Sequence, residues 1–336
     1  MNRRALPSLF ALAAVVGCAE RTPAPAGDAA TGAASSTPAS ASAPALRIVA
    51  TIGDSASTVE GLAEHRGALY TADWKDGGLY RIDSVGSATR VGQLPTKPGT
   101  AILGLAADSA GNIYAAVPDA GVIYRVDGAR LGAKDFEPAK DAKPFVTGAK
   151  GANGINFDAE GHLWISGGDQ NVVYHAPPTG GAAHVFAKGY ASLSTDTTMP
   201  VRVYVTNGLG IDSKGAIYTA NTGTGEITRI EVKPGRVAGN ISPLAKDTRL
   251  LGADGIVVTA GDTLYVTANF SNTIAKIDPA GNVTVLAADE AHETLRFPAE
   301  LKKIGSTVYV TNLNFPVGRN AGQTHKGATI AALQLP

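Results

Sequence analysis

The sequence predicts an all-β protein, a six-bladed β-propeller in which each blade is a four-stranded antiparallel sheet. The 336 residues include 40 Gly, and no long stretch has the 3.6-residue apolar period of helices. One pattern recurs along the chain: a polar residue and Gly, an apolar run, a polar turn, and a second apolar run that ends in an aromatic residue. This pattern is typical of the two strands of a β-hairpin. The copies lie 43 to 54 residues apart, a spacing that favours propeller blades.

The six copies were aligned on their Gly and on the terminal aromatic residue. Asn207–Tyr218 illustrates the pattern well, with Asp212 and Gly215 in its turn. We call the residue that opens each copy its first position. The first positions are Glu60, Leu103, Asn153, Asn207, Asp254 and Pro298.

Two further strands are expected in each blade. Third strands alternate apolar and polar residues, as half-buried antiparallel strands should; they are expected at 78–83, 121–127, 171–175, 226–230 and 273–278. Outer strands are visible at 88–91, 183–186 and 282–286.

The last copy has no outer strand of its own, because the chain ends after an apolar segment at 328–333. The segment 46–51 precedes the first copy and has no partner within it. We therefore expect the N-terminal strand to complete the sixth blade and close the ring, which removes an open sheet edge. The longest departures from the repeat are expected at 128–143, 189–202, 233–249 and 315–327. The last of these segments is a candidate lid.

The first 45 residues read as a targeting segment and a tether. Two Arg residues precede a short apolar stretch, and Val15-Val16-Gly17-Cys18 resembles the lipobox of bacterial lipoproteins. We expect a signal peptide at 1–17 and a lipid on Cys18, with an ordinary signal peptide as the alternative. Residues 18–45 are rich in Ala, Ser, Thr, Pro and Gly and are expected to be a disordered tether, so the propeller spans 46–336. The expected location is the cell envelope, at the periplasmic face of the outer membrane.

Composition excludes several classes of function. The formal net charge is +0, which argues against a nucleic-acid partner. Cys18 is the only Cys, so neither an internal disulfide nor a thiolate metal cluster can form. No G-x-S-x-G motif supports Ser-His-Asp catalysis. We expect a monomer that contacts the membrane through its lipid.

The first positions point to a metal site, because the innermost strands of a propeller line its axis. Four of the six carry carboxylate or amide oxygens: Glu60, Asn153, Asn207 and Asp254. Oxygen ligands of this kind, with two negative charges, suit Ca²⁺ or another divalent cation. The alternative is that these residues only cap turns, since Asn-Gly and Asp-Gly are common turn dipeptides.

The blade pattern and these four residues resemble the senescence marker protein, gluconolactonase and luciferin-regenerating enzyme family. Its metal ligands are a Glu in the first blade, an Asn in the third, an Asn in the fourth and an Asp in the fifth. The matching residues here are Glu60, Asn153, Asn207 and Asp254, and the resemblance covers about residues 55–336. It implies metal-dependent hydrolysis of a lactone or related ester. Asp254 is then the catalytic residue, either as the base that activates water or as the direct nucleophile.

One departure from the family affects the substrate. Sugar-lactone members carry an Arg two residues before the third-blade Asn, where this chain has Gly151. The expected substrate contacts are Asn272, Asn312, Tyr190 and His325, and further candidates at the mouth are Trp74, Phe270, Asn314 and Phe315. This mixture suits a ligand less polar than a sugar.

Two functions therefore stand side by side. The first is a metal-dependent lactonase or esterase that acts outside the cytoplasm on a small molecule. The second is a non-catalytic propeller of the NHL type that binds a ligand or a protein. Chemistry like that of virginiamycin lyase or strictosidine synthase is a further possibility.

Overall fold

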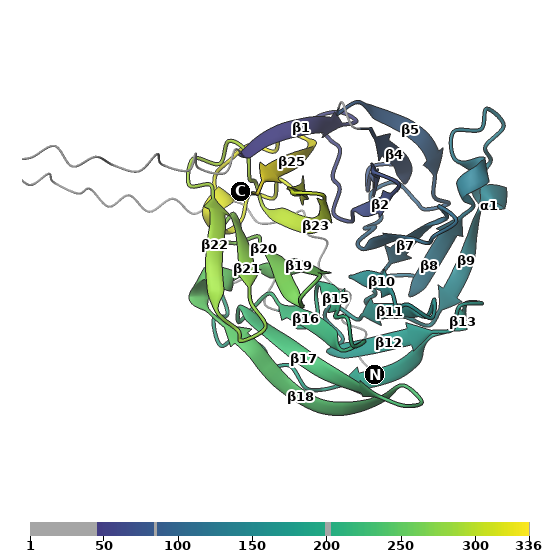
Figure 1. The fold of residues 1–336 in the computed structure, drawn as a ribbon. Coiled ribbons are helices and arrows are strands. Elements are labelled where there is room, and N and C mark those ends of the chain that lie inside the picture. The colour runs from purple at the N-terminus through teal and green to yellow at the C-terminus, as the bar shows by residue number, and fades with distance from the viewer. Residues whose placement is uncertain (1–45, 84–85, 199–202, 336) are drawn as a thin grey trace, which may run out of the picture. The chain divides into compact units, whose positions relative to one another are not determined.

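A computed structural model describes residues 46–83, 86–198 and 203–335. In these ranges the chain forms six antiparallel sheets that follow one another around a ring (Figure 1), so the predicted six-bladed β-propeller is confirmed. The expected signal peptide, the tether and Cys18 lie outside the described residues. Among the described residues, no helix combines the length and hydropathy needed to cross a membrane.

We number the blades one to six in chain order, each from its inner to its outer strand. Blade one contains β2 (Ala63–His65), β3 (Ala68–Ala72), β4 (Gly78–Ile82) and β5 (Ala88–Gln93). Blade two contains β6 (Leu105–Ala107), β7 (Ile113–Val117), β8 (Val122–Val126) and β9 (Ala142–Thr147). Blade three contains β10 (Ile155–Phe157), β11 (Leu163–Ser166), β12 (Val172–Ala176) and β14 (His184–Lys188). Blade four contains β15 (Leu209–Ile211), β16 (Ile217–Asn221), β17 (Glu226–Lys233) and β18 (Val237–Lys246). Blade five contains β19 (Ala253–Thr259), β20 (Thr263–Ala268), β21 (Thr273–Ile277) and β22 (Val283–Ala288). Blade six contains β23 (Pro298–Ile304), β24 (Thr307–Asn312), β25 (Ala328–Gln334) and β1 (Leu46–Ile52).

The N-terminal strand closes the ring as predicted. β1 pairs antiparallel with β25 at the outer edge of blade six, from Leu46 opposite Leu333 to Ile52 opposite Ala328. Strands from the two ends of the propeller thus share one sheet, seen as the purple β1 beside the yellow β25 in Figure 1. The paired edge supplies hydrogen bonds that neither segment could make alone.

The recurring turn has a local physical cause. In blade four the carboxylate of Asp212 accepts hydrogen bonds from the backbone N–H groups of Lys214 and Ala216, at 2.9 and 2.8 Å. The hydroxyl of Tyr218, the aromatic residue that ends the second apolar run, donates to the same carboxylate at 3.1 Å. Asp108 and Tyr114 in blade two, and Asp158 and Trp164 in blade three, repeat this link. The Asp therefore joins the turn to the second strand, which explains why Asp, Gly and an aromatic residue recur together.

Two expected loops contain regular structure. The segment 233–249 contains all of β18, the ten-residue outer strand of blade four. Alternation is weak in this strand, which is why the sequence pattern did not reveal it. The segment 128–143 contains a 3-10 turn (Gly128–Arg130) and a short helix α1 (Pro138–Asp141) before β9. A two-residue strand, β13 (Gly181–Ala182), leaves blade three and pairs in parallel with β9 of blade two.

Strand direction determines which segments share a face of the propeller. The inner strand of each blade begins at one face and ends at the other, in the hairpin turn that leads to the second strand. Because the following strands run antiparallel, three features return to the first face: the first positions, the turns between second and third strands, and the connections to the next blade. We call this face the mouth.

Candidate functional site

The first-position residues are packed directly against one another around the axis. The backbone N–H of Gly104 donates to the carbonyl of Asn153 in the next blade, at 2.9 Å. A Cβ atom on Gly61, Gly104 or Gly208 would collide with the backbone oxygen of the next blade's first-position residue. At these three positions the Gly that follows the first position is therefore required by the close approach of neighbouring inner strands. This contact sets the first positions side by side.

Blade six departs from the predicted alignment by one residue. Pro298 pairs with Asn312 and Leu301 with Val310, as Ala253 pairs with Ala268 and Ile256 with Val266 in blade five. Ala299 therefore occupies the first position, and Glu300 stands where the other blades have Gly. The expectation for Pro298 was wrong because the β23–β24 hairpin is shorter: Ile304 pairs with Thr307, whereas Thr259 pairs with Thr263 in blade five.

All four predicted metal ligands are buried. Their exposed fractions are 7% for Glu60, 4% for Asn153, 5% for Asn207 and 4% for Asp254. Glu300 is 6% exposed and adds a third carboxylate to the same region. Charged and amide side chains are seldom buried to this extent unless they are paired. Their partners therefore decide what the site can hold.

The side chain of Asn207 has a fixed orientation. Its amide nitrogen Nδ2 donates to Thr222 Oγ1 at 2.9 Å, and that hydroxyl donates to the carbonyl of Ala253 at 2.9 Å. The amide oxygen Oδ1 is buried and has no hydrogen-bond partner among the described residues. A buried oxygen without a donor is costly unless another group, such as a cation, contacts it.

Asp254 is held by a neighbouring amide. Nδ2 of Asn269 donates to Asp254 Oδ2 at 3.1 Å, and Asn269 Oδ1 is a second buried oxygen without a partner in the described ranges. Asn269 lies just after β20, the second strand of blade five, and Asp254 lies in β19, the inner strand of the same blade. Its side chain therefore contacts Asp254 from the adjacent strand. It is a positioning residue for the carboxylate.

The carboxylates repel one another in a buried environment. Burial raises the pKa of Asp254 to about 8, with a further contribution from the charge of Glu300. Burial also raises the pKa of Glu60 well above its ordinary value, and the charges of Asp254 and Glu300 add to the effect. The pKa of Glu300 is raised by burial too, although Lys302 and the N–H of Leu301 oppose the rise. Desolvation and like charge both disfavour the ionised forms.

Glu300 is partly neutralised, in contrast to Glu60 and Asp254. Lys302 Nζ lies 3.6 Å from Glu300 Oε1, and the backbone N–H of Leu301 donates to the same oxygen at 2.9 Å. The described part of the chain contains no group of three or more His, Cys, Asp or Glu side chains placed to hold a metal. We therefore treat Glu300 as a charged neighbour of the site and keep the candidate ligands to two carboxylates and two amides. Two surface cavities, of about 240 and 400 Å³, are lined by outer residues such as Arg90 and Arg125 and do not belong to this site.

An aromatic cluster borders the site at the mouth. It comprises Trp74, Tyr204, Phe270, Phe297 and Phe315, which pack with Ala299 and Leu313. Each lies just after a second strand or just before an inner strand, which is why all five reach the same face. Burial raises the pKa of Tyr204 to about 12, and the largest further contributions come from the charges of Glu60, Asp169, Asp119 and Asp254. The phenol therefore lies within electrostatic reach of the candidate ligands.

Asn272 and Asn312, two of the expected substrate contacts, are fully buried and already hydrogen-bonded. Asn272 exchanges hydrogen bonds with Asn320, at 2.9 and 3.0 Å, and accepts from the N–H of Phe297 at 2.9 Å. Asn312 accepts from the N–H of Arg296 and donates to the carbonyl of Thr294. Both side chains therefore hold the mouth loops together.

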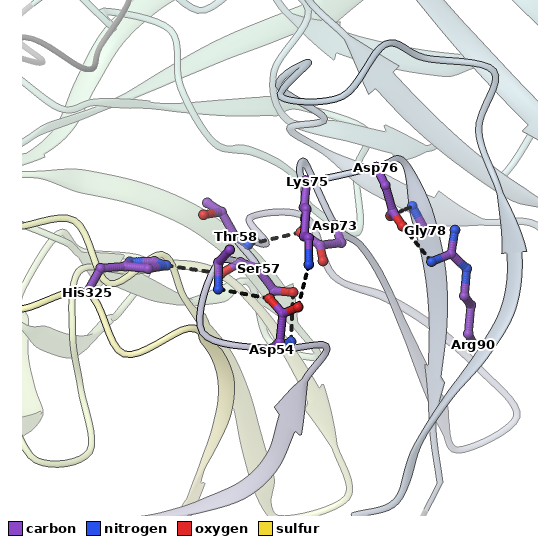
Figure 2. Close-up of polar contacts among 10 residues, drawn as sticks. Asp54, Ser57, Thr58, Asp73, Lys75, Asp76, Gly78, Arg90 and His325 are labelled. Atoms are coloured by element: carbon purple, nitrogen blue, oxygen red, sulfur yellow. Dashed lines mark hydrogen bonds and ion pairs between the residues drawn. The ribbon is translucent and has the colours of Figure 1, made fainter.

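Tyr190 and His325 also have partners within the protein. The hydroxyl of Tyr190 is hydrogen-bonded to Thr219 Oγ1 at 2.9 Å, and its ring packs between blades three and four. His325 reaches from the last loop toward the segment after β1, with Nε2 3.2 Å from the carbonyl of Ser57 (Figure 2). Its other ring nitrogen lies 3.3 Å from the carbonyl of Asn314. His325 thus links the last loop to the segment where the ring closes.

The backbone conformation at position 151 explains why this chain has Gly there instead of the Arg of sugar-lactone members. Gly151 has a φ of 71°, in the left-handed region, and a Cβ there would lie 2.5 Å from the carbonyl oxygen of Gly167. An Arg at this position would be strained as well as crowded. The backbone before Asn153 is therefore shaped for glycine.

Sequence reasoning missed three residues of this region. Asn269 was recognisable only as the polar end of a second strand, and Tyr204 lies in a connection without a repeat pattern. Glu300 could have been found by aligning the Leu or Ile that follows each Gly, which places Leu301 opposite Ile256. That alignment gives the register found in blade six.

Comparison with known proteins gives a consistent fold. The luciferin-regenerating enzyme is 14% identical, with 87% of this chain and 95% of that chain covered and a TM-score of 0.64. A gluconolactonase from Xanthomonas campestris is 17% identical over 87% of this chain and 90% of that chain, with a TM-score of 0.62. Virginiamycin B lyase from Staphylococcus aureus is 14% identical, covers 87% and 100%, and has a TM-score of 0.58. At these identities the likeness concerns the fold alone.

No curated protein matches the sequence. A family model described as the SMP-30/gluconolactonase/LRE-like region matches residues 58–288. The matched span includes Glu60, Asn153, Asn207 and Asp254. The chain belongs to the SMP-30/gluconolactonase/LRE-like family.

Proposed function

We propose that this protein is a metal-dependent hydrolase of lactones or related esters that acts outside the cytoplasm. The observation that carries the proposal is the pair of buried carboxylates, Glu60 and Asp254, beside an amide oxygen of Asn207 that has no partner. A folded protein does not keep such a set without a compensating proton or cation. A lactonase-like propeller is also what the family assignment supports.

The energetic argument favours a cation. Burying an unpaired carboxylate costs several kcal/mol, and two that repel each other cost more. Without a cation, the pKa of about 8 means that Asp254 retains its proton at neutral pH, and the raised pKa of Glu60 favours its protonated form in the same way. A divalent cation would displace those protons and satisfy the free amide oxygen at the same time.

The donor set fits Ca²⁺ best. Glu60, Asn153, Asn207 and Asp254 would hold the ion, and all four offer hard oxygen donors. Water and substrate would complete the six to eight oxygens that Ca²⁺ takes. When bound, the cation would polarise the substrate carbonyl and stabilise negative charge on its oxygen.

The chain's own residues supply the proton transfer. In hydrolysis, the oxygen of water adds to the carbonyl carbon, and the bond from that carbon to the ring or ester oxygen breaks. We assign the water's proton first to the carboxylate of Asp254, which returns it to the departing oxygen. Asn269 orients this carboxylate through its hydrogen bond to Oδ2. Direct attack by Asp254 is the alternative route.

A non-catalytic binding propeller is the second candidate, and two observations favour it. Asn272 and Asn312 are engaged within the protein, and Gly151 replaces the Arg of sugar-lactone members. A metal-stabilised propeller that binds a ligand without hydrolysing it would need neither free Asn side chains at these positions nor an Arg at position 151.

The decisive experiment combines metal binding with a substrate screen. The full chain is titrated with Ca²⁺ by calorimetry, beside Glu60→Gln, Asp254→Asn and, as a control, Glu160→Gln in an exposed turn. Lactones, aryl esters and phosphotriesters are then assayed with Ca²⁺ and with chelator. We expect binding and metal-dependent turnover in the wild type and the control only. A wild type that binds no divalent cation and melts at the same temperature with and without it excludes the metal site.

The location outside the cytoplasm is part of the proposal and rests on residues 1–18. Cys18 would carry the lipid, with the propeller facing the periplasm from the outer membrane. Cell fractionation of the wild type and Cys18→Ser tests this directly. Release of the variant from the membrane fraction is expected, and equal membrane recovery of both proteins contradicts it.

A further inference from the structure

The aromatic cluster is anchored at its centre and open at its edge. Phe297 is 2% exposed, and the rings of Phe270 and Phe315 lie 5.7 and 5.6 Å from it. Trp74 meets Phe315 edge to face at 5.9 Å. Trp74, Tyr204, Phe270 and Phe315 remain half-buried, so part of each ring faces away from the packed centre. Rigid aromatic side chains with free surface at a functional mouth are typical of ligand contacts.

The cluster is continuous with the axis. It packs on Ala299, the first position of blade six, which neighbours Asp254 in blade five. Nε1 of Trp74 donates to the carbonyl of Ile102 at 2.7 Å, directly before Leu103, the first position of blade two. Both first positions without oxygen donors, Ala299 and Leu103, are thus apolar and lie beside aromatic rings. The cluster therefore borders the axis at blades two and six, on either side of Glu60 in blade one.

Polar recognition is weak at this mouth. Two basic side chains on nearby loops are already paired: Lys75 with Asp54, as Figure 2 shows, and Arg319 with Glu290 at 3.4 Å. The charges that act most strongly on Tyr204 are all carboxylates. Neither Lys75 nor Arg319 therefore offers an unpaired positive charge to an anionic substrate beside the cluster.

We propose that the mouth takes an uncharged ligand with an apolar, aromatic ring next to its ester or lactone carbonyl. Trp74 and Phe315 contact the ring, and Phe270 forms the opposite wall. The Tyr204 hydroxyl makes no hydrogen bond within the described residues, so it is available to the ligand's polar edge. That this ligand is a substrate rests on the proposed function; that it binds here does not.

The kinetic experiment compares two lactones. Dihydrocoumarin is aromatic and uncharged, whereas glucono-δ-lactone is polar; both are assayed with Ca²⁺ and corrected for spontaneous hydrolysis. We expect kcat/KM to be at least about 100-fold higher for dihydrocoumarin, and Trp74→Ala and Phe315→Leu to reduce it about 10-fold each, mainly through KM. Phe136→Leu, a half-buried Phe on an outer loop, is the matched control and should change neither value.

A binding experiment separates this inference from catalysis. The lactam analogue of dihydrocoumarin, 3,4-dihydro-2-quinolinone, resists hydrolysis and is titrated against tryptophan fluorescence. Trp164 is 1% exposed and hydrogen-bonded to Asp158, so the change should come from Trp74 and disappear in Trp74→Phe. Binding of the lactam without turnover of any lactone or ester supports the ligand class while removing the hydrolase. Turnover of glucono-δ-lactone without lactam binding, or no binding and no preference at all, overturns the inference.

Discussion

Asp254→Asn is the substitution whose effect on stability should depend both on pH and on metal. The carboxyl of Asp254 is 4% exposed, and burial next to Glu300 raises its pKa from 3.8 to about 8. In metal-free protein, the folded state therefore keeps a proton that the unfolded state has lost. The contribution to stability is complete below about pH 4, declines as pH rises, and is lost at about pH 8.

The magnitude follows from the width of that window. Each pH unit between the two pKa values costs about 1.4 kcal/mol, so at pH 7 the upper limit is roughly 4 kcal/mol. Asn carries no charge and can still pair with Asn269. Without metal, Asp254→Asn should match the wild type near pH 4 and exceed it by up to roughly 4 kcal/mol at pH 7.

Calcium should narrow this difference at pH 7 and reverse the order near pH 5, where the difference without metal is only about 1.6 kcal/mol. The wild type gains about 2.7 kcal/mol when Ca²⁺ is present at 100 times its dissociation constant. The variant has lost a charged ligand and should gain much less. Ca²⁺ should therefore stabilise the wild type, which has the buried Asp254 carboxylate, more than the Asp254→Asn variant.

The assay is urea unfolding of both proteins from pH 4 to 8.5, with chelator and with Ca²⁺. Equal destabilisation of Asp254→Asn at every pH in chelator would show that the carboxylate has a purely structural role. A full Ca²⁺ response in the variant would refute its assignment as a ligand. Glu160→Gln, in an exposed turn, should follow the wild type throughout.

Three further substitutions test the surroundings of the site. Glu300→Gln removes a charge that raises the pKa of Asp254, so the pH-dependent loss of stability in chelator should be smaller and end at lower pH. Calorimetry should show Ca²⁺ binding weakened by roughly 10-fold, because a negative charge near the ion is lost. Gly151→Arg places a side chain at a φ of 71° and should lower stability by about 1–2 kcal/mol in urea unfolding, without creating activity on glucono-δ-lactone. Tyr218→Phe removes a hydrogen bond to Asp212 and should cost about 1 kcal/mol with no effect on Ca²⁺ affinity; a change in affinity would mean that the turn communicates with the axis.

The sequence predicted the fold because each blade is specified locally. Alternating strands, an Asp turn and a Gly that permits close packing are all contained within about 45 to 50 residues, and repetition makes the pattern visible. The closing strand was predicted from the absence of an outer strand in the last copy, and the pairing of β1 with β25 confirmed it. The outer strand β18 escaped notice because its alternation is weak.

The substrate contacts stay a prediction. Asn272, Asn312, Tyr190 and His325 all come from mouth loops or their ends, but each has hydrogen-bond partners within the protein. A polar residue in a loop looks the same in sequence whether its partner is a ligand or a carbonyl 20 residues away. The aromatic residues named beside them, Trp74, Phe270 and Phe315, do form a common cluster.

By itself, the sequence determined the propeller and the series of first-position residues, because both follow from a local repeat. Only the tertiary structure decided that Asn269 holds Asp254 and that Asn207 leaves an oxygen free. These features depend on side-chain contacts between the ends of the inner and second strands of a blade, and the repeat pattern does not encode those contacts. The same holds for the aromatic cluster, whose five rings come from four blades and meet only when the ring closes.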